Sequence, residues 1–66
     1  MSETVKIDWV DKFGNADSGK FPTKLFMIWV TNDLGKTVRN VAKDFVEDYC
    51  GLEGKIHSIT SISEVE

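Results

Sequence analysis

The chain has 66 residues, of which 41% are hydrophobic, and it carries a formal net charge of −3. We expect one domain over residues 1–66, and the single cysteine and single histidine exclude an internal disulfide and a zinc site. The net acidity disfavours general binding of nucleic acid through its phosphates, which needs clustered Lys and Arg.

The chain has no segment that predicts insertion into a membrane or export. The longest apolar run, residues 25–30, is far below the roughly 20 residues that span a bilayer. Residues 1–4 precede an alternating pattern and not the basic stretch and apolar run of an export signal. Together with the lone thiol of Cys50, these features predict a protein of the reducing cytoplasm.

The first predicted element is a strand over residues 4–11. Val5, Ile7 and Trp9 recur at every second position, which is the period of a half-buried strand. The following residues, 12–23, include a polar stretch rich in turn formers at 15–20. We predict that they form a loop, which is longer than the usual connection of about 2–5 residues in a hairpin.

Part of this loop is similar to a phosphate-binding motif. Residues 14–20, Gly-Asn-Ala-Asp-Ser-Gly-Lys, match the first seven positions of the phosphate-loop pattern. The next position holds Phe21 in place of the Ser or Thr that binds magnesium, and Pro22 follows where a helix should begin. We therefore interpret the stretch as a glycine-rich hairpin loop and predict no cofactor.

A second strand is predicted over residues 24–31, because Leu25 to Val30 are six consecutive apolar residues. Successive side chains of a strand point to opposite faces of the sheet. This strand would therefore carry three apolar side chains on each face. We expect it to lie in the centre of the sheet, antiparallel to the first strand.

A helix is predicted over residues 34–50. Its apolar residues recur at helical spacing and form one stripe. They are Leu34, Val38, Val41, Ala42, Phe45, Val46, Tyr49 and Cys50. Asp33 is the expected N-cap, and Gly51 is expected in the left-handed conformation after the last turn.

The last predicted strand covers residues 55–63. Ile56, Ile59 and Ile62 recur at a spacing of three, which fits neither a regular strand nor a regular helix. The β-branched residues favour a strand. A β-bulge or a strong twist would bring the three isoleucines to one face.

These elements predict an α+β fold, in which a three-stranded sheet has one helix packed on one face, in the order β-β-α-β. One helix covers only one side of a sheet, whereas the strand 24–31 is apolar on both sides. Either the loop 12–23, with Phe13 and Phe21, folds over the second side as a lid, or that side is an exposed interface. The sequence leaves open which alternate residues of this strand face the helix.

The charges of the predicted helix oppose its macrodipole. Basic residues lie in its N-terminal half, whereas Asp44, Glu47 and Asp48 lie in its C-terminal half. This arrangement costs about 0.3–1 kcal/mol for each charge near an end. Either the acidic end, with Glu53 nearby, steers a basic partner toward the protein, or it is an ordinary solvated face.

No catalytic constellation emerges from the sequence. His57 stands near Ser58, Ser61 and Ser63, but a nucleophile and its base need a third orienting group inside a pocket that excludes water. Three strands and one helix seldom enclose such a pocket. We therefore predict no enzymatic activity, no catalytic residue and no metal site.

In its predicted element order and acidic composition, the chain resembles the small RNA-polymerase inhibitors of short-tailed coliphages. The stretch from Val30 through Asp33 to Leu34, which leads into Val38 and Ala42, looks like the strand-to-helix junction of many compact phage proteins. The resemblance implies a stand-alone, non-enzymatic protein that blocks a host machine in the host cytoplasm. No motif of the family is matched, so no functional residue is carried over.

The leading prediction is a small protein-binding module, encoded by a phage or mobile element, that inhibits a host enzyme or nucleoprotein complex. Met27 and Trp29 are the expected apolar anchors, because Trp and Met are enriched in interfaces. Asp44, Glu47 and Asp48 are the expected charges at the rim of the contact.

Two alternatives belong to other functional classes. In a binder of single-stranded nucleic acid, Trp9, Phe26 or Trp29 would stack on bases beside nearby lysines. In a structural homodimer, two copies would pair their open sheet faces or edge strands.

Overall fold

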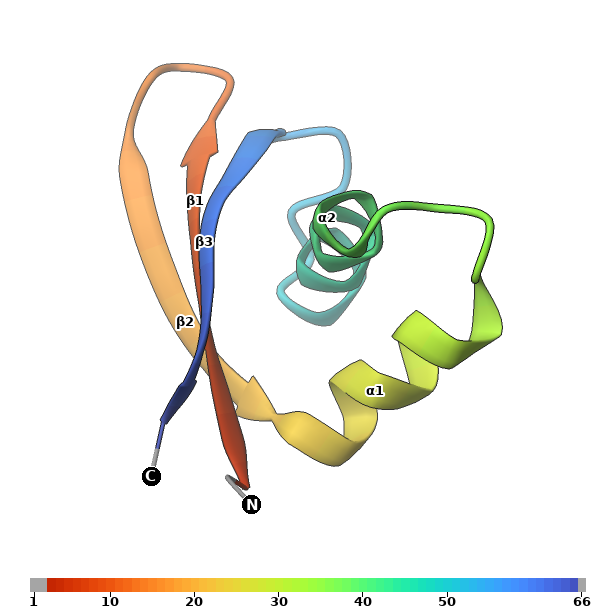
Figure 1. Cartoon of the computed structure of the whole chain (residues 1–66). Helices are drawn as coiled ribbons and strands as arrows, with labels where there is room; N and C mark the ends of the chain where they lie inside the picture. The colour runs from red at the N-terminus through yellow and green to blue at the C-terminus, as the bar shows by residue number, and fades with distance from the viewer. Residues whose placement is uncertain (1–2, 66) are drawn as a thin grey trace.

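The computed structural model describes residues 3–65 and has the element order β-β-α-α-β. Its strands form one antiparallel sheet in the order β2-β1-β3, and both helices lie on the same side of this sheet (Figure 1). The α+β class and the three-stranded sheet are as predicted. The predicted order β-β-α-β is corrected, because the structure has a second helix where the second strand was expected.

The first two strands form a hairpin. β1 (Thr4–Asp11) covers the range predicted for the first strand, whereas β2 (Ala16–Pro22) occupies most of the range 12–23 predicted as a loop. Only Phe21 of β2 is buried. Opposite Trp9 and Ile7 of β1, the strand has Asp17 and Gly19, so its sequence lacks the apolar alternation that would have predicted it.

The turn of this hairpin is closed by Asp11. Its Oδ1 accepts hydrogen bonds from the backbone N–H groups of Phe13 and Asn15, both at 2.9 Å. The bond from Asn15 has the largest effect, and together these bonds hold the pKa of the Asp11 carboxyl below its ordinary value. Gly14 adopts a φ of 85°, which the turn requires.

The third strand contains the predicted irregularity. β3 (Ile56–Val65) pairs with β1, which is therefore the central strand of the sheet. The pairing register shifts at two places along β1, so β3 accommodates an extra residue at each. Ile56, Ile59 and Ile62 consequently all contribute to the core. The β-bulge is confirmed, and it explains the isoleucine spacing of three.

The residues predicted as the second strand form α1 (Thr23–Asn32) instead. Helical geometry divides the apolar run into a face that packs on the core and a face that does not. The packed residues are Leu25, Phe26, Trp29 and Val30. An unbroken apolar run fits both periods, and Pro22, whose φ of −61° suits the start of a helix, ends β2 and leads directly into α1.

The second helix is shorter than predicted. α2 (Val38–Tyr49) begins after Thr37, whose Oγ1 accepts a hydrogen bond from the backbone N–H of Asn40 at 3.2 Å. Asp33, the predicted N-cap, is instead the C-cap of α1, because the chain needs a turn to pass from one helix to the next. Gly51 has a φ of 68°, so the prediction of a left-handed residue after the last turn is confirmed.

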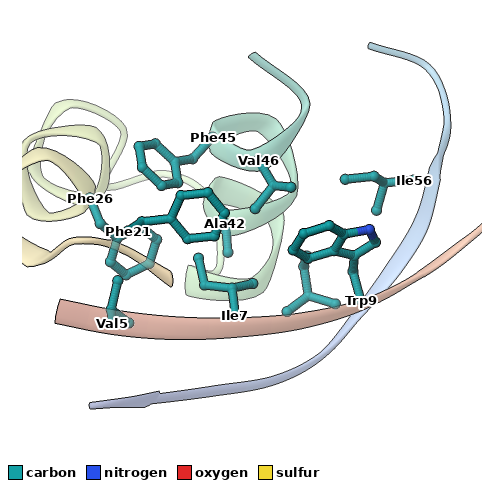
Figure 2. Close-up of a cluster of buried hydrophobic side chains, with 10 residues drawn as sticks. Val5, Ile7, Trp9, Phe21, Phe26, Ala42, Phe45, Val46 and Ile56 are labelled. Carbon is teal, nitrogen blue, oxygen red and sulfur yellow. The ribbon is translucent and has the colours of Figure 1, made fainter. Parts of the chain in front are cut away.

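The hydrophobic core lies between the sheet and the two helices (Figure 2). Phe45 of α2 is fully buried, and its ring lies 5.3–5.7 Å, centroid to centroid, from four other aromatic rings. These rings belong to Phe21, Phe26, Trp29 and Tyr49. Val5, Ile7 and Trp9 face this core from β1, as their alternation predicts.

The opposite face of the sheet is polar. Its central rows are Lys20, Lys6 and Ser63, then Ser18, Asp8 and Ser61. The predicted exposed row of apolar side chains is wrong, because the run that was to supply it forms α1. The alternative of a lid is also wrong, because Phe13 is 83% exposed and Phe21 is buried in the core.

Candidate protein-binding site

Four of the five residues predicted to bind a partner line one surface depression. Trp29 of α1 and Asp44, Glu47 and Asp48 of α2 surround it, together with Glu53 from the loop before β3. We call this depression the acidic hollow, and its volume is about 250 Å³. It brings together an aromatic ring and four carboxylates from three separate segments of the chain.

Helical spacing explains how α2 presents its carboxylates. Residues three or four positions apart are neighbours on the surface of a helix, so Asp44 lies beside both Glu47 and Asp48. The ring of Phe45 is turned into the core, where it meets the ring of Trp29 edge to face at 5.7 Å and 71°. This contact holds Trp29 next to the acidic side of α2.

Glu53 reaches the hollow because the chain reverses direction after α2. The backbone N–H of Leu52 donates to the carbonyl oxygen of Glu47 at 2.8 Å. The side chain of Glu47 is held as well, since its Oε2 accepts a hydrogen bond from the backbone N–H of Gly54 at 3.0 Å. These bonds fasten the loop against the last turn of α2.

One cation offsets part of the negative charge. The Nζ of Lys36 lies 2.8 Å from Asp44 Oδ2 and 3.4 Å from Asp33 Oδ2. The hydrogen bond with Asp44, followed by that with Asp33, raises the pKa of Lys36. Among the ion pairs between residues 3 and 65, none involves Asp48 or Glu53, so these two carboxylates are available to a cation from outside the chain.

The hollow suits an organic cation. It lies at the C-terminal half of α2, where the partial negative charge of the helix end favours a positive ligand. A cation over the face of an indole is attracted further by about 0.5–2 kcal/mol. In the described part of the chain, no three His, Cys, Asp or Glu side chains form a group that could hold a metal ion.

Met27, the fifth predicted residue, lies apart from the other four. It belongs to a second depression of about 740 Å³ along the exposed side of α1, which we call the α1 groove. The lining residues are Glu3, Pro22, Thr23, Lys24, Met27, Ile28 and Thr31. Met27 is 46% exposed and Ile28 is 54% exposed. The single patch predicted from the sequence is therefore two surfaces.

Ile28 is absent from the predicted binding residues, and Glu53 was expected near the acidic end of the helix but not among those residues. Gly51 could have indicated that Glu53 lies beside the helix, because a left-handed residue after a helix directs the following residues back along that helix. The signal for Ile28 was the helical spacing of Lys24, Ile28 and Thr31. The surrounding apolar run concealed this spacing.

The aromatic residues proposed to stack on bases are not placed for that role. Trp9 and Phe26 are each only 5% exposed, and the open face of the sheet carries neither ring. Trp29 is partly buried against the core. A stacking surface for nucleic acid would need several exposed rings in a row, and these three rings do not form one.

Comparison with known proteins gives no relative for this chain: no family model, curated protein or solved structure matches it. Within residues 3–65, neither helix is long and apolar enough to cross a membrane.

Proposed function

We propose that this protein is a non-enzymatic protein-binding module, whose acidic hollow accepts an Arg or Lys side chain from a basic surface of its partner. The observation that carries the proposal is the convergence of Trp29 with four carboxylates on one depression. These residues come from α1, α2 and the loop after α2, so the site exists only in the folded chain.

Charge and shape both favour a guanidinium group. A planar guanidinium donates to carboxylates in a fork and also stacks on aromatic rings. In the acidic hollow, Asp48 and Glu53 would accept such hydrogen bonds while Trp29 offers its ring. Asp44 and Glu47 already have partners in Lys36 and Gly54, so they would mainly contribute negative potential.

The location of the charge also supports recognition of a basic surface. Placing acidic residues at the C-terminal half of α2 costs stability through the helix dipole. A cluster of this sign increases the rate of encounter with a positive partner. Retaining such an unfavourable cluster is understandable if a partner compensates for it.

A basic partner fits an inhibitory role, which we propose from the charge of the hollow alone, because the element order and the strand-to-helix junction behind the phage resemblance are not those of the structure. Enzymes that act on nucleic acid present clustered Lys and Arg to phosphates, and a small acidic module bound to that cluster would block it. Inhibition of a host enzyme or nucleoprotein complex is therefore our proposal for the biological role.

The proposal is tested by titrating the isotope-labelled protein with a short peptide that has one Arg between glycines. We expect the indole N–H signal of Trp29 and the amide signals of residues 47–54 to shift with a Kd on the order of 1 mM. The indole signal of Trp9 should stay in place, because Trp9 is buried. Binding should weaken as salt is added. Absence of shifts would refute the proposal.

Two controls distinguish binding in the acidic hollow from general attraction to the negative charge of the protein. The same peptide with citrulline in place of Arg should produce no shifts. The double variant Asp48→Asn, Glu53→Gln should weaken binding roughly tenfold, whereas Asp8→Asn, Glu64→Gln, which removes the same charge elsewhere, should change it less than about twofold. Equal losses in both variants would show that the hollow is not the site.

A further inference from the structure

We propose that the α1 groove is the contact surface between two copies of this chain, with the two α1 helices packed antiparallel. The proposal goes beyond partner binding and uses no residue of the acidic hollow. It follows from the symmetry of the exposed side of α1, from its single charge and from the weakness of α1 as an isolated helix.

The exposed side of α1 is arranged so that it can pack on itself. Lys24, Met27, Ile28 and Thr31 line the groove and occupy neighbouring positions on successive turns. They are symmetric about the middle of the helix. An antiparallel copy would therefore place Met27 opposite Ile28 and Lys24 opposite Thr31. The apolar pair would be central, and the polar residues would lie at the ends, as in most interfaces.

The charge of α1 is also self-complementary in this arrangement. Lys24, the only charged residue of the helix, lies in its first turn, and neither an acidic residue in the first turn nor a basic residue in the last turn complements the dipole. In an antiparallel pair, each Lys24 would lie beside the C-terminal turn of the other α1, where a cation is stabilised. The two lysines would be at opposite ends of the contact.

The helix itself benefits from a second layer of packing. α1 has ten residues, and Pro22 at its N-cap provides no side-chain hydrogen bond. Its sequence contains Ile, Val, Thr, Phe and Trp, which are mediocre helix formers, and helices of this length are marginal without tertiary contacts. The core covers only one side of α1, so a second copy would supply packing on the other.

Two other surfaces are less suited to self-association. Two acidic hollows would repel each other, because each has four carboxylates and is offset by one lysine. The open face of the sheet is formed by Lys, Asp and Ser side chains in its central rows. The α1 groove combines two exposed apolar side chains with one acidic residue, Glu3, and one basic residue, Lys24. Two copies would therefore meet there without net repulsion, so a second copy is the occupant that its chemistry favours.

Sedimentation equilibrium of the full chain, from about 10 μM to 1 mM, tests the proposal. The weight-average mass of the wild type should rise from 7.4 kDa toward twice that value. Ile28→Lys should remain monomeric throughout. Leu34→Lys, at an 82% exposed apolar residue outside the groove, should behave as the wild type. Circular dichroism should show that all three proteins have the same secondary structure.

A second variant keeps the test decisive if Ile28→Lys fails to fold. Lys24→Glu places an acidic residue in the first turn, which should stabilise α1 in the monomer and yet weaken the dimer about tenfold, because each carboxylate would face the C-terminal turn of the other helix. A wild type that stays monomeric at 1 mM, or a Lys24→Glu variant that associates as strongly as the wild type, would overturn the proposal. Asp48→Asn, Glu53→Gln should leave association unchanged.

Discussion

Gly19 occupies a position on β2 that has no room for a side chain. A Cβ atom there would lie 2.8 Å from Cζ of Phe21 and 3.3 Å from Cη2 of Trp9. The ring of Phe21 is also in contact with the rings of Phe45 and Tyr49, each at 5.3 Å between centroids. Since Phe21 is enclosed in this way, it cannot easily move to admit a methyl group.

We predict that Gly19→Ala lowers the free energy of unfolding by about 1–3 kcal/mol, as overpacking of a core does. This loss exceeds the 0.4–1 kcal/mol that such a substitution commonly gains by restricting the unfolded chain. The control is Gly35→Ala, because a Cβ at Gly35 meets nothing within 4 Å. Urea denaturation should place Gly35→Ala at or slightly above the stability of the wild type. A Gly19→Ala variant as stable as that control would contradict the packing described here.

At the scale of the elements, the two helices begin in different ways. α2 has a side-chain cap, since Thr37 Oγ1 accepts a hydrogen bond from Asn40. α1 begins at a proline without such a bond. The stability of α1 therefore depends on the packing of Trp29 and its neighbours, whereas α2 has both a cap and a clear apolar stripe. This difference explains why the sequence indicates α2 far more clearly than α1.

Thr37→Ala should destabilise the protein by about 0.5–2 kcal/mol, because it removes the acceptor at the start of α2. Thr37→Ser retains the hydroxyl and should cost much less. Asp33→Ala removes only the exposed ion pair with Lys36, which is worth about 0–1 kcal/mol. Thermal and urea denaturation of the three variants would compare the two residues. A larger loss for Asp33→Ala than for Thr37→Ala would support the cap at Asp33 that the sequence predicts.

At the scale of the whole molecule, Phe45 connects the elements. Its ring contacts Phe21 from β2 and both Phe26 and Trp29 from α1. The same residue therefore supports the core and, through Trp29, one wall of the acidic hollow. A domain of this length has a total stability of roughly 3–10 kcal/mol, so the loss of one central ring is a large fraction of the whole.

We predict that Phe45→Ala costs about 3–5 kcal/mol and lowers the midpoint of thermal unfolding by more than about 10 °C. Phe13→Ala, at a residue that is 83% exposed, should change stability by no more than about 0.5 kcal/mol. Far-ultraviolet circular dichroism during heating would measure both. A cooperative transition of Phe45→Ala close to that of the wild type would show that the ring cluster is not central to the fold.

Several features of the structure follow from short stretches of sequence. β1 was predictable because Val5, Ile7 and Trp9 alternate, and the conformation of Gly51 because a glycine follows the last turn of an apolar stripe. For the last strand, the isoleucine spacing of three predicted either a β-bulge or a strong twist, and the pairing register shows the bulge. For β1 and Gly51, the local pattern allows one solution.

The acidic side of α2 was likewise evident from the sequence, because positions three and four apart on a helix are always neighbours. The position of Trp29 beside this acidic side was not evident from the sequence. The strand predicted over residues 24–31 placed Trp29 in the sheet, whereas the structure places it on a helix beside α2. The acidic residues of the hollow could thus be predicted from the sequence, but the depression that they form with Trp29 could not.

The alternating strand, the left-handed Gly51 after α2 and the sign of the charge follow from the amino-acid sequence alone. The helical state of residues 25–30 depends on the packing of the whole chain, because six apolar residues in a row satisfy the strand and helix periods equally. The choice depends on what else covers the sheet. β2 and β3 already flank β1, so the apolar run is buried by packing as a helix on the sheet's inner face. That packing turns Trp29 toward the carboxylates and leaves Met27 and Ile28 exposed.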